Sequence, residues 1–362
     1  MLASMHPRVL ASGPAWGSAR PAAHRPARRV ARPIAGLTAI VLSLTLAACG
    51  GGDKLSDKLP DSQPVEGGTR LAALWPLTGE LVSGSTPDRP VMVTKIDNSG
   101  KSRPQVGLDR ADLITEQLVE GGSTRLAVFF YRQLPRVAGP VRSMRASDIG
   151  IVKPAHGVLV GSGAAGQTLG RLRGAKITHF TEGGPGFYRD GGRSAPYDLM
   201  VDLPKLAKAV RKKAVVPASY LPWGKEADFT GGLPARRINA VFSRSHTTSW
   251  RYQGGKYRNQ NSYAAQGKQF VPDSVLVVRV RQTDAGYLDP AGNKVPETIY
   301  SGKGQILLFH KGEVVRGTWK KKSRQTPIRL STAAGPLKVP AGHVWIELVP
   351  TDKAGGRVSF GK

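Results

Sequence analysis

The sequence predicts an α+β protein in which an N-terminal mixed α/β layered domain is followed by a β-rich C-terminal domain. Between about residues 70 and 230, strand-like alternating runs are interspersed with helix-like runs, as in layered α/β or α+β domains. From residue 235 onward, short alternating runs recur between turn signals, with no convincing helical stretch. We expect a lipoprotein signal peptide at 1–48, a flexible tether at 49–69, and domains at 70–233 and 234–362.

The first 49 residues predict export and lipid anchoring. Residues 1–33 contain six Arg and no acidic residue, and an uncharged apolar run of 15 residues follows at 34–48. This is the pattern of an export signal, and the run is shorter than the ~20 residues of a membrane-spanning helix. It ends in Leu46-Ala47-Ala48-Cys49, which resembles a bacterial lipobox, whose cysteine receives diacylglycerol. Alternatives are an ordinary signal peptide with a chance cysteine, or a buried apolar helix.

Cys49 is the only cysteine, so intramolecular disulfides and Cys-rich zinc modules are excluded. If Cys49 carries lipid, the chain lies at the extracytoplasmic face of the bacterial cell membrane. The tether at 49–69 is rich in Gly, Pro and Asp and would hold the folded part away from the membrane.

The net charge of +28 comes from 53 Lys and Arg against 25 Asp and Glu. Removing residues 1–48 leaves 47 basic and 25 acidic residues, a net charge of +22, and residues 235–362 hold 22 basic against 7 acidic residues. At an envelope location this charge meets anionic lipid head groups or anionic wall polymers. We therefore expect no nucleic-acid partner.

The N-terminal elements follow from local pattern. Residues 89–97 alternate like a strand and end in a polar turn. Residues 113–120 and 124–131 flank a Gly-Gly-Ser turn and predict a hairpin, although the first could instead be a helix from Asp109. Helices are expected at 143–153, 164–173 and 203–213, with a short buried strand at 157–161.

A cluster of Pro and Gly between 217 and 234 marks the boundary before the C-terminal domain. Strands are expected there at 239–243, 248–253, 256–259, 275–281, 305–310, 313–319 and 343–349. Trp250, Trp319 and Trp345 are expected in the core of this domain rather than as sugar-stacking platforms. Lys320, Lys321 and Lys322 are expected to form a solvated turn.

Several motifs stand in a fixed order along the chain. They are Pro76-Leu-Thr-Gly79, Asp97-Asn98, Arg103-Pro104-Gln105, Ala111-Asp112, Glu116, Leu118-Val119-Glu120-Gly121-Gly122, Thr124-Arg125, Gly139-Pro140-Val141-Arg142-Ser143-Met144-Arg145, Tyr188-Arg189-Asp190, Arg193, Ala195-Pro196, Ser301-Gly302-Lys303-Gly304, Gly317-Thr318-Trp319-Lys320 and Trp345-Ile346-Glu347-Leu348-Val349-Pro350. Over about residues 75–350 the chain resembles the YerB-type lipoproteins, whose domain of unknown function has an N-terminal and a C-terminal half. Tyr197 stands where that family frequently has His. The resemblance implies an envelope lipoprotein and supplies no reaction.

The remaining candidate chemistry is polar and rich in arginine. No nucleophile elbow, phosphate loop or His-based zinc motif is present in the sequence, and we expect no metal and no cofactor. The candidate ligand-binding residues are Asp97, Asn98, Arg103, Arg125, Arg142, Arg145, Arg189 and Arg193, and the candidate acid/base residues are Glu116 and Glu120. Guanidinium forks at a helix start favour an anion site. The alternative is internal arginine–carboxylate pairing that stabilises the sheet.

Two functions follow from these residues. The first is a lipid-anchored binding or scaffold protein for an anionic wall component or a protein partner. The second is an envelope transferase or hydrolase acting on a phosphorylated glycan or a lipid-linked substrate. A cleft with unpaired charges would favour the enzyme, whereas mutual pairing of the same side chains would favour binding.

Overall fold

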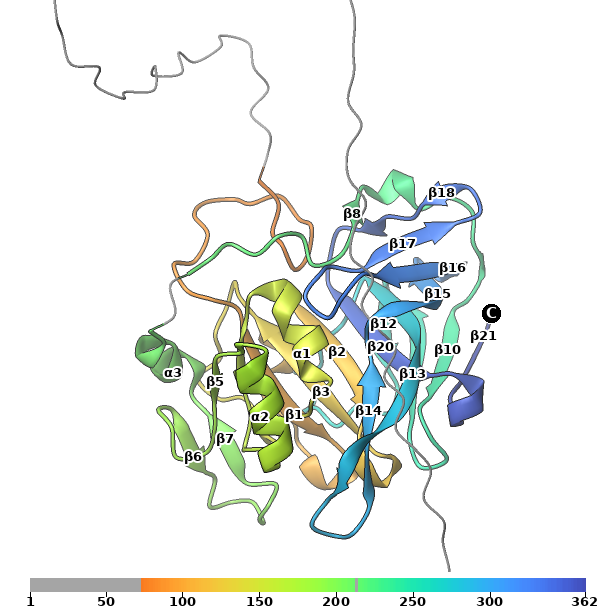
Figure 1. The fold of residues 1–362 in the computed structure, drawn as a ribbon. Helices are drawn as coiled ribbons and strands as arrows, with labels where there is room; N and C mark the ends of the chain where they lie inside the picture. Colours follow the sequence, from red (N-terminus) through yellow and green to blue (C-terminus); the bar gives the residue numbers. More distant parts are fainter. Residues whose placement is uncertain (1–72, 212–213) are drawn as a thin grey trace, which may run out of the picture. The chain divides into compact units, whose positions relative to one another are not determined.

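The structure is a computed structural model that describes residues 73–211 and 214–362. The predicted signal peptide, Cys49 and the tether lie outside the described residues. The described part is sheet-rich with few helices (Figure 1). Within it, no helix is long and apolar enough to cross a membrane.

One 13-stranded sheet contains strands from both sides of the predicted boundary at 233/234. Its main path, from one edge to the other, is β18 (Gly335–Pro336), β17 (Arg329–Thr332), β16 (Glu313–Lys321), β15 (Gly302–His310), β13 (Ser274–Leu288), β20 (Val344–Pro350), β2 (Leu113–Leu118), β3 (Thr124–Phe130), β1 (Met92–Asn98), β4 (Val158–Val160) and β5 (His179–Phe180), with β14 (Lys294–Ile299) on β13 and β9 (Leu233–Pro234) on β16. The late strand β20 pairs in parallel with both β13 and β2. The two halves of the sequence are therefore joined by main-chain hydrogen bonds.

The expected hairpin at 113–131 is present, with β2 and β3 in antiparallel register. The segment 113–118 is thus a strand and not the alternative helix. Strands β1, β2 and β3 have almost no exposed position, because both faces of the sheet are covered. Such strands read as nearly continuous apolar runs, and a polar residue within them points into the interior.

The helices are shorter than expected. They are α1 (Asp148–Val152), α2 (Gly166–Gly174) and α3 (Leu203–Ala209). The predicted helix at 143–153 is wrong in its first turn, because the main-chain N–H groups of Arg142 and Met144 donate to Lys95 and Gly163 instead. Short 3-10 turns occur at Gly100–Ser102, Leu108–Arg110, Glu120–Gly122, Lys153–Ala155, Glu226–Asp228 and Asp352–Ala354.

A second sheet of four strands packs on the main sheet. Its order is β12 (Lys256–Asn259), β11 (Thr247–Gln253), β10 (Arg237–Val241) and β21 (Arg357–Gly361). Two small pairs complete the fold, β6 (Phe187–Arg189) with β7 (Leu199–Val201), and β8 (Trp223–Gly224) with β19 (Val339–Pro340). The sequence does not predict strand β21 or the two small pairs, nor β5, β9, β14, β17 and β18 of the main sheet.

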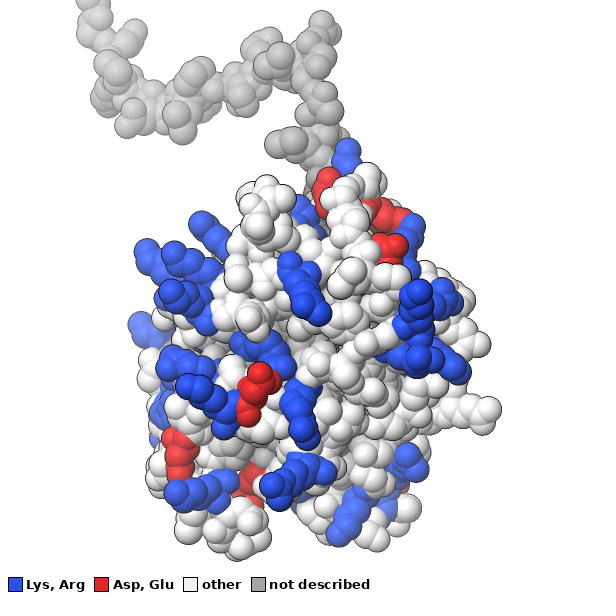
Figure 2. Space-filling view, turned by 90° about the vertical axis from the view of Figure 1, so that its right-hand side faces the viewer, with Lys and Arg blue, Asp and Glu red and all other residues white. Residues whose placement is uncertain are grey.

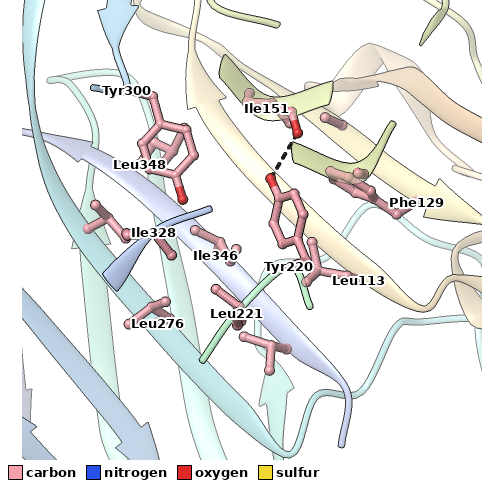
Figure 3. Packing of buried hydrophobic residues seen from close by; sticks show 14 of the residues in the cluster. Leu113, Phe129, Ile151, Tyr220, Leu221, Leu276, Tyr300, Ile328, Ile346 and Leu348 are labelled. Atoms are coloured by element: carbon pink, nitrogen blue, oxygen red, sulfur yellow. Dashed lines mark hydrogen bonds between the residues drawn. The ribbon is translucent and has the colours of Figure 1, made fainter. Parts of the chain in front are cut away.

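Apolar side chains form a core on each face of the main sheet. One core packs α1, α2 and the segment around Tyr220 against the sheet, and the Tyr220 hydroxyl donates to the carbonyl of Ile151 (Figure 3). The other core packs β7, α3 and the four-stranded sheet. Trp250, Trp319 and Trp345 are at most 3% exposed, as expected for core residues.

The lysine run at 320–322 is not a solvated turn. Strand β16 continues through Lys321, and strand alternation turns this side chain inward, where it is 1% exposed. Its ammonium group donates to the carbonyls of Ser323 and Arg324. Burial lowers the pKa of Lys321 to about 7.

Candidate functional site

A cleft of about 710 Å³ lies where β1 and β2 end and β3 begins, and we call it the arginine cleft. Its lining includes a cluster of charged and hydroxyl side chains and a connection that extends from β13 to β14. The lining residues are Glu120, Arg125, Arg142, Ser143, Arg145, Ser162, Gly163, Ala164, Ala165, Tyr287, Leu288, Asp289, Pro290, Ala291 and Val295. It collects three of the arginines that the sequence singled out.

The register of β1 and β3 determines where the first charged side chains of this site lie. Asp97 on β1 stands opposite Arg125 on β3, so both side chains leave the same face of the sheet. The segment between β3 and α1 then carries Arg142 and Arg145 to the same place, because the Arg142 N–H donates to the carbonyl of Lys95 on β1 at 2.9 Å.

Glu120 is shared by two buried arginines. Arg125 Nη2 donates to Glu120 Oε1 at 3.1 Å, and Arg145 Nε donates to Glu120 Oε2 at 2.9 Å. Arg125 is 5% exposed; burial, together with the charge of Arg142, lowers its pKa to about 10. Its Nε has no hydrogen-bond partner within the described residues. This triad therefore holds more positive than negative charge.

Arg142 forms the more accessible part of the cleft. Its Nε donates to Asp97 Oδ2 at 3.1 Å and its Nη1 to the carbonyl of Pro196 at 3.2 Å. The guanidinium also lies over the ring of Tyr197, with its Cζ 5.2 Å from the ring centroid, which is within the ~6 Å of a cation–π interaction. The ring of Tyr197 thus helps to hold the Arg142 guanidinium in place.

A buried ion pair supports the cleft from below. Lys95 Nζ and Asp148 Oδ1 are 2.8 Å apart, and both side chains are fully buried. Asp148 Oδ1 also accepts from Gln117, and its Oδ2 accepts from the main-chain N–H of Arg145 at 2.7 Å. Asp148 thereby fixes the position from which Arg145 reaches Glu120.

Glu116 lies on the other face of the sheet. Adjacent residues of a strand point to opposite faces, so Gln117 supports the cleft and Glu116 does not reach it. Glu116 Oε1 accepts from Thr124 at 2.7 Å and from Asn98 at 2.9 Å, and it contacts His246 Nε2 at 2.9 Å. Asn98, another predicted ligand-binding residue, therefore belongs to this buried cluster and not to the cleft.

The buried cluster contains a second carboxyl group, Glu347 on β20, directly opposite Glu116 on β2. Burial and the Glu116 charge raise the pKa of Glu347 well above its usual range, so this group carries the proton. Burial alone would raise the pKa of Glu116 as well, but hydrogen bonds from His246 and Thr124 outweigh it and lower that pKa. Trp250 Nε1 donates to Glu347 Oε1 at 2.8 Å.

This pair could not be predicted from the sequence, because strand alternation does not reveal which strands of the two halves are neighbours. The same applies to His246, whose loop lies next to Glu116 only in the folded chain.

The other predicted arginines lie outside the cleft lining. Arg189 pairs with Glu182 and Asp198, which hold the β6–β7 hairpin together. Arg193 pairs with Asp190 and donates to the carbonyl of Pro104 at 2.7 Å. Arg103 lies over the ring of Tyr263. These three arginines stabilise loops.

Among the described residues, no group of three or more His, Cys, Asp or Glu is arranged to hold a metal ion. The cleft therefore offers guanidinium and hydroxyl groups as its binding chemistry. Arginine forks match the geometry of phosphate and carboxylate groups.

Two family models match this chain, one for each half. They are the N-terminal domain of the Protein of unknown function (DUF3048), at residues 77–216, and its C-terminal domain, at residues 238–346. The chain belongs to this family. All three arginines of the cleft, and Glu120, lie within the N-terminal match.

A relative in Bacillus subtilis agrees with this assignment, both in sequence and in fold. The chain is 23% identical, over 295 residues, to "Putative lipoprotein YerB" of strain 168, an alignment that covers 76% of this chain and 86% of that protein. The crystal structure of the YerB protein is similar in fold, with a TM-score of 0.66 and 22% identity, and the match covers 80% of this chain and all of that one.

Proposed function

We propose that the chain is a lipid-anchored lipoprotein of the bacterial cell envelope, attached through Cys49 to the extracytoplasmic face of the cell membrane. The lipobox-like Leu46-Ala47-Ala48-Cys49 supports this, since it contains the only cysteine. A relative named as a lipoprotein, aligned over most of its length, supports it too. The acyl chains of such an anchor bury enough CH₂ groups for stable attachment.

We further propose that the folded part binds an anionic group of an envelope component or of a partner protein in the arginine cleft. The observation that carries this proposal is the clustering of Arg125, Arg142 and Arg145, whose directly bonded carboxylates among the described residues are Glu120 and Asp97. Across the cleft, Asp289 forms no ion pair with a described arginine, although its charge acts on Arg145 over a longer distance. A phosphate or carboxylate would supply the missing negative charge.

The wall of the cleft adds further donors. Helix α2 begins there, and its N-cap residue Ala165 has no side chain that could accept from the first N–H groups. Free N–H groups at a helix start attract anions. The hydroxyl groups of Ser143 and Ser162 lie 3.4 Å apart on the same wall; one donates to the other, which leaves one O–H of the pair for a ligand.

Binding is favoured over a transferase or hydrolase activity by the state of the two candidate carboxylates. Glu116 is fully buried and saturated with hydrogen bonds on the opposite face of the sheet. Glu120 accepts hydrogen bonds from Arg125 and Arg145 on its two carboxylate oxygens, so both oxygens are already engaged. Neither is arranged to take a proton from a substrate.

Thermal unfolding of the full-length protein in detergent, with inorganic phosphate as the probe, tests the cleft. Phosphate should raise the unfolding midpoint of the wild type, because a ligand at 100 times its Kd stabilises the folded state by about 2.7 kcal/mol. Arg142→Gln should remove most of this rise. Arg173→Gln, which removes an exposed arginine near the C-terminal end of α2, should keep it. An equal rise in both variants would contradict the proposal.

A further inference from the structure

Two rows of basic side chains cross the sheets of the C-terminal half. In the four-stranded sheet, Arg237 on β10 stands opposite Arg251 on β11, which stands opposite Arg258 on β12. All three side chains are exposed. We call Arg237, Arg251 and Arg258 the arginine row.

The main sheet repeats the pattern. Lys303 on β15 stands opposite Lys320 on β16, which stands opposite Arg329 on β17. These three side chains are exposed as well. We call Lys303, Lys320 and Arg329 the lysine row.

Such rows destabilise the folded protein. Like charges directly opposite one another on neighbouring strands are destabilising, and strands lie only about 4.8 Å apart. No ion pair neutralises any of the six side chains within the described residues. The four strands of the smaller sheet contain no acidic residue at all. A charge arrangement that weakens the free protein is readily explained if an anionic partner neutralises it.

Each basic row is followed by a row of neutral hydrogen-bonding side chains. Beside the arginine row, Ser249 and Asn239 are opposite one another, with Ser359 next in line, and Ser249 Oγ donates to Asn239 Oδ1 at 2.8 Å. Beside the lysine row, Gln305 and Thr318 are opposite one another, and Thr318 Oγ1 lies 3.0 Å from Ser331 Oγ. Amides and hydroxyls of this kind bind the hydroxyl groups of polyols and sugars.

The neutral rows lie in shallow grooves. A groove of about 380 Å³ includes Arg237, Arg251, Asn239 and Ser249, and another of about 600 Å³ includes Gln305, Arg316, Thr318 and Ser331. The two adjoin, because Arg316 of the second groove lies over the ring of Phe360, which lines the first, at 5.5 Å. Figure 2 faces the side on which β10 and β21 lie in Figure 1, and basic side chains predominate over acidic ones there.

We propose that the two rows bind a linear polyanion whose hydroxyl-bearing repeats are joined by phosphodiesters. The basic rows would contact successive phosphates, and the neutral rows the hydroxyl groups between them. A bilayer is a poorer match, since the rows lie on two different sheets with grooves and neutral side chains between them. This inference relies on the envelope location proposed above but not on the arginine cleft.

The test measures binding of a short poly(glycerol phosphate) chain to the full-length protein in detergent, at two salt concentrations. We expect binding that weakens with salt. The triple variants R237Q/R251Q/R258Q and K303Q/K320Q/R329Q should each bind at least tenfold more weakly than wild type. The matched control R173Q/K205Q/K208Q removes the same charge from exposed positions of α2 and α3 and should bind like wild type. Both row variants should unfold at least as high in temperature as wild type, which checks folding.

Equal loss in the control and row variants would overturn the proposal, because net charge alone would then explain binding. Binding to vesicles of anionic phospholipid but not to the polymer would overturn it too and identify a membrane-facing surface. So would equally tight binding of inorganic polyphosphate, which lacks hydroxyl groups. Arg142→Gln should retain polymer binding and the row variants should retain the phosphate response of the cleft, so the two proposals can fail separately.

Discussion

At the scale of single residues, the fold buries charged groups on both faces of its main sheet. The interactions that replace the lost hydration differ from one group to the next. Lys95 is paired with Asp148, and Glu116 is surrounded by donors. Lys321 has only main-chain carbonyls and the ring of Tyr300, 5.2 Å from its ammonium. An ammonium without a carboxylate partner is poorly compensated for lost hydration, which makes Lys321 the most pH-sensitive of these groups near neutrality.

Because Lys321 is buried, we predict that the free energy of unfolding depends on pH. Its folded pKa of about 7 lies below the ordinary lysine value, so between these values the unfolded chain binds one more proton than the folded chain. Stability should therefore rise with pH above about 7, by up to about 1.4 kcal/mol per pH unit from this group. In denaturant titrations from pH 6 to 10, Lys321→Met should lose this slope and Lys320→Met should keep it. An unchanged slope in Lys321→Met would show that the ammonium stays charged in the folded state.

At the scale of elements, β20 has the largest consequence for the fold. It lies between β13 and β2, and its Glu347 stands beside Glu116 of β2. Without β20, strand β2 would become an open edge of the sheet. Without β2, strand β20 would become an open edge in the same way. Long unpaired edges of apolar strands favour aggregation.

We therefore predict that residues 70–233 and residues 234–362, when expressed separately, both fail to fold. Each should lack a cooperative unfolding transition and be digested rapidly by protease. Co-expression should restore a protected complex, because β20 then regains both of its neighbours. A 70–233 piece that unfolds cooperatively on its own would contradict the role given to β20 and would support an independent N-terminal domain.

Local pattern predicted most strands of this fold, since alternation and turn residues are properties of neighbouring positions. It overextended the helix at 143–153, where main-chain groups of Arg142 and Met144 bond to distant partners. It also gathered Arg125, Arg142 and Arg145 correctly around the end of β1 but placed Glu116 with them. Which face a strand residue occupies depends on register and packing, and the neighbour of β2 lies more than 200 residues away in the chain.

At the scale of the whole molecule, charge is distributed unevenly. The arginines of the arginine cleft belong to the N-terminal half, although residues 287–291 and 295 of the C-terminal half complete its lining. The two basic rows lie entirely in the C-terminal half, which carries 22 basic and 7 acidic residues between 235 and 362. In the proposed lipoprotein, residues 49–69 would connect the folded part to the anchor at Cys49. We thus propose an anchored protein that presents its binding surfaces to its surroundings.

Native mass spectrometry of the full-length protein, extracted from its own membranes in detergent, tests this account most directly. We predict a covalent mass for a chain that begins at a lipidated Cys49, together with a non-covalent anionic adduct. Arg142→Gln should keep the lipid and lose the adduct, and Cys49→Ala should leave the membrane fraction. An unmodified Cys49, or an adduct that persists in Arg142→Gln, would contradict the account.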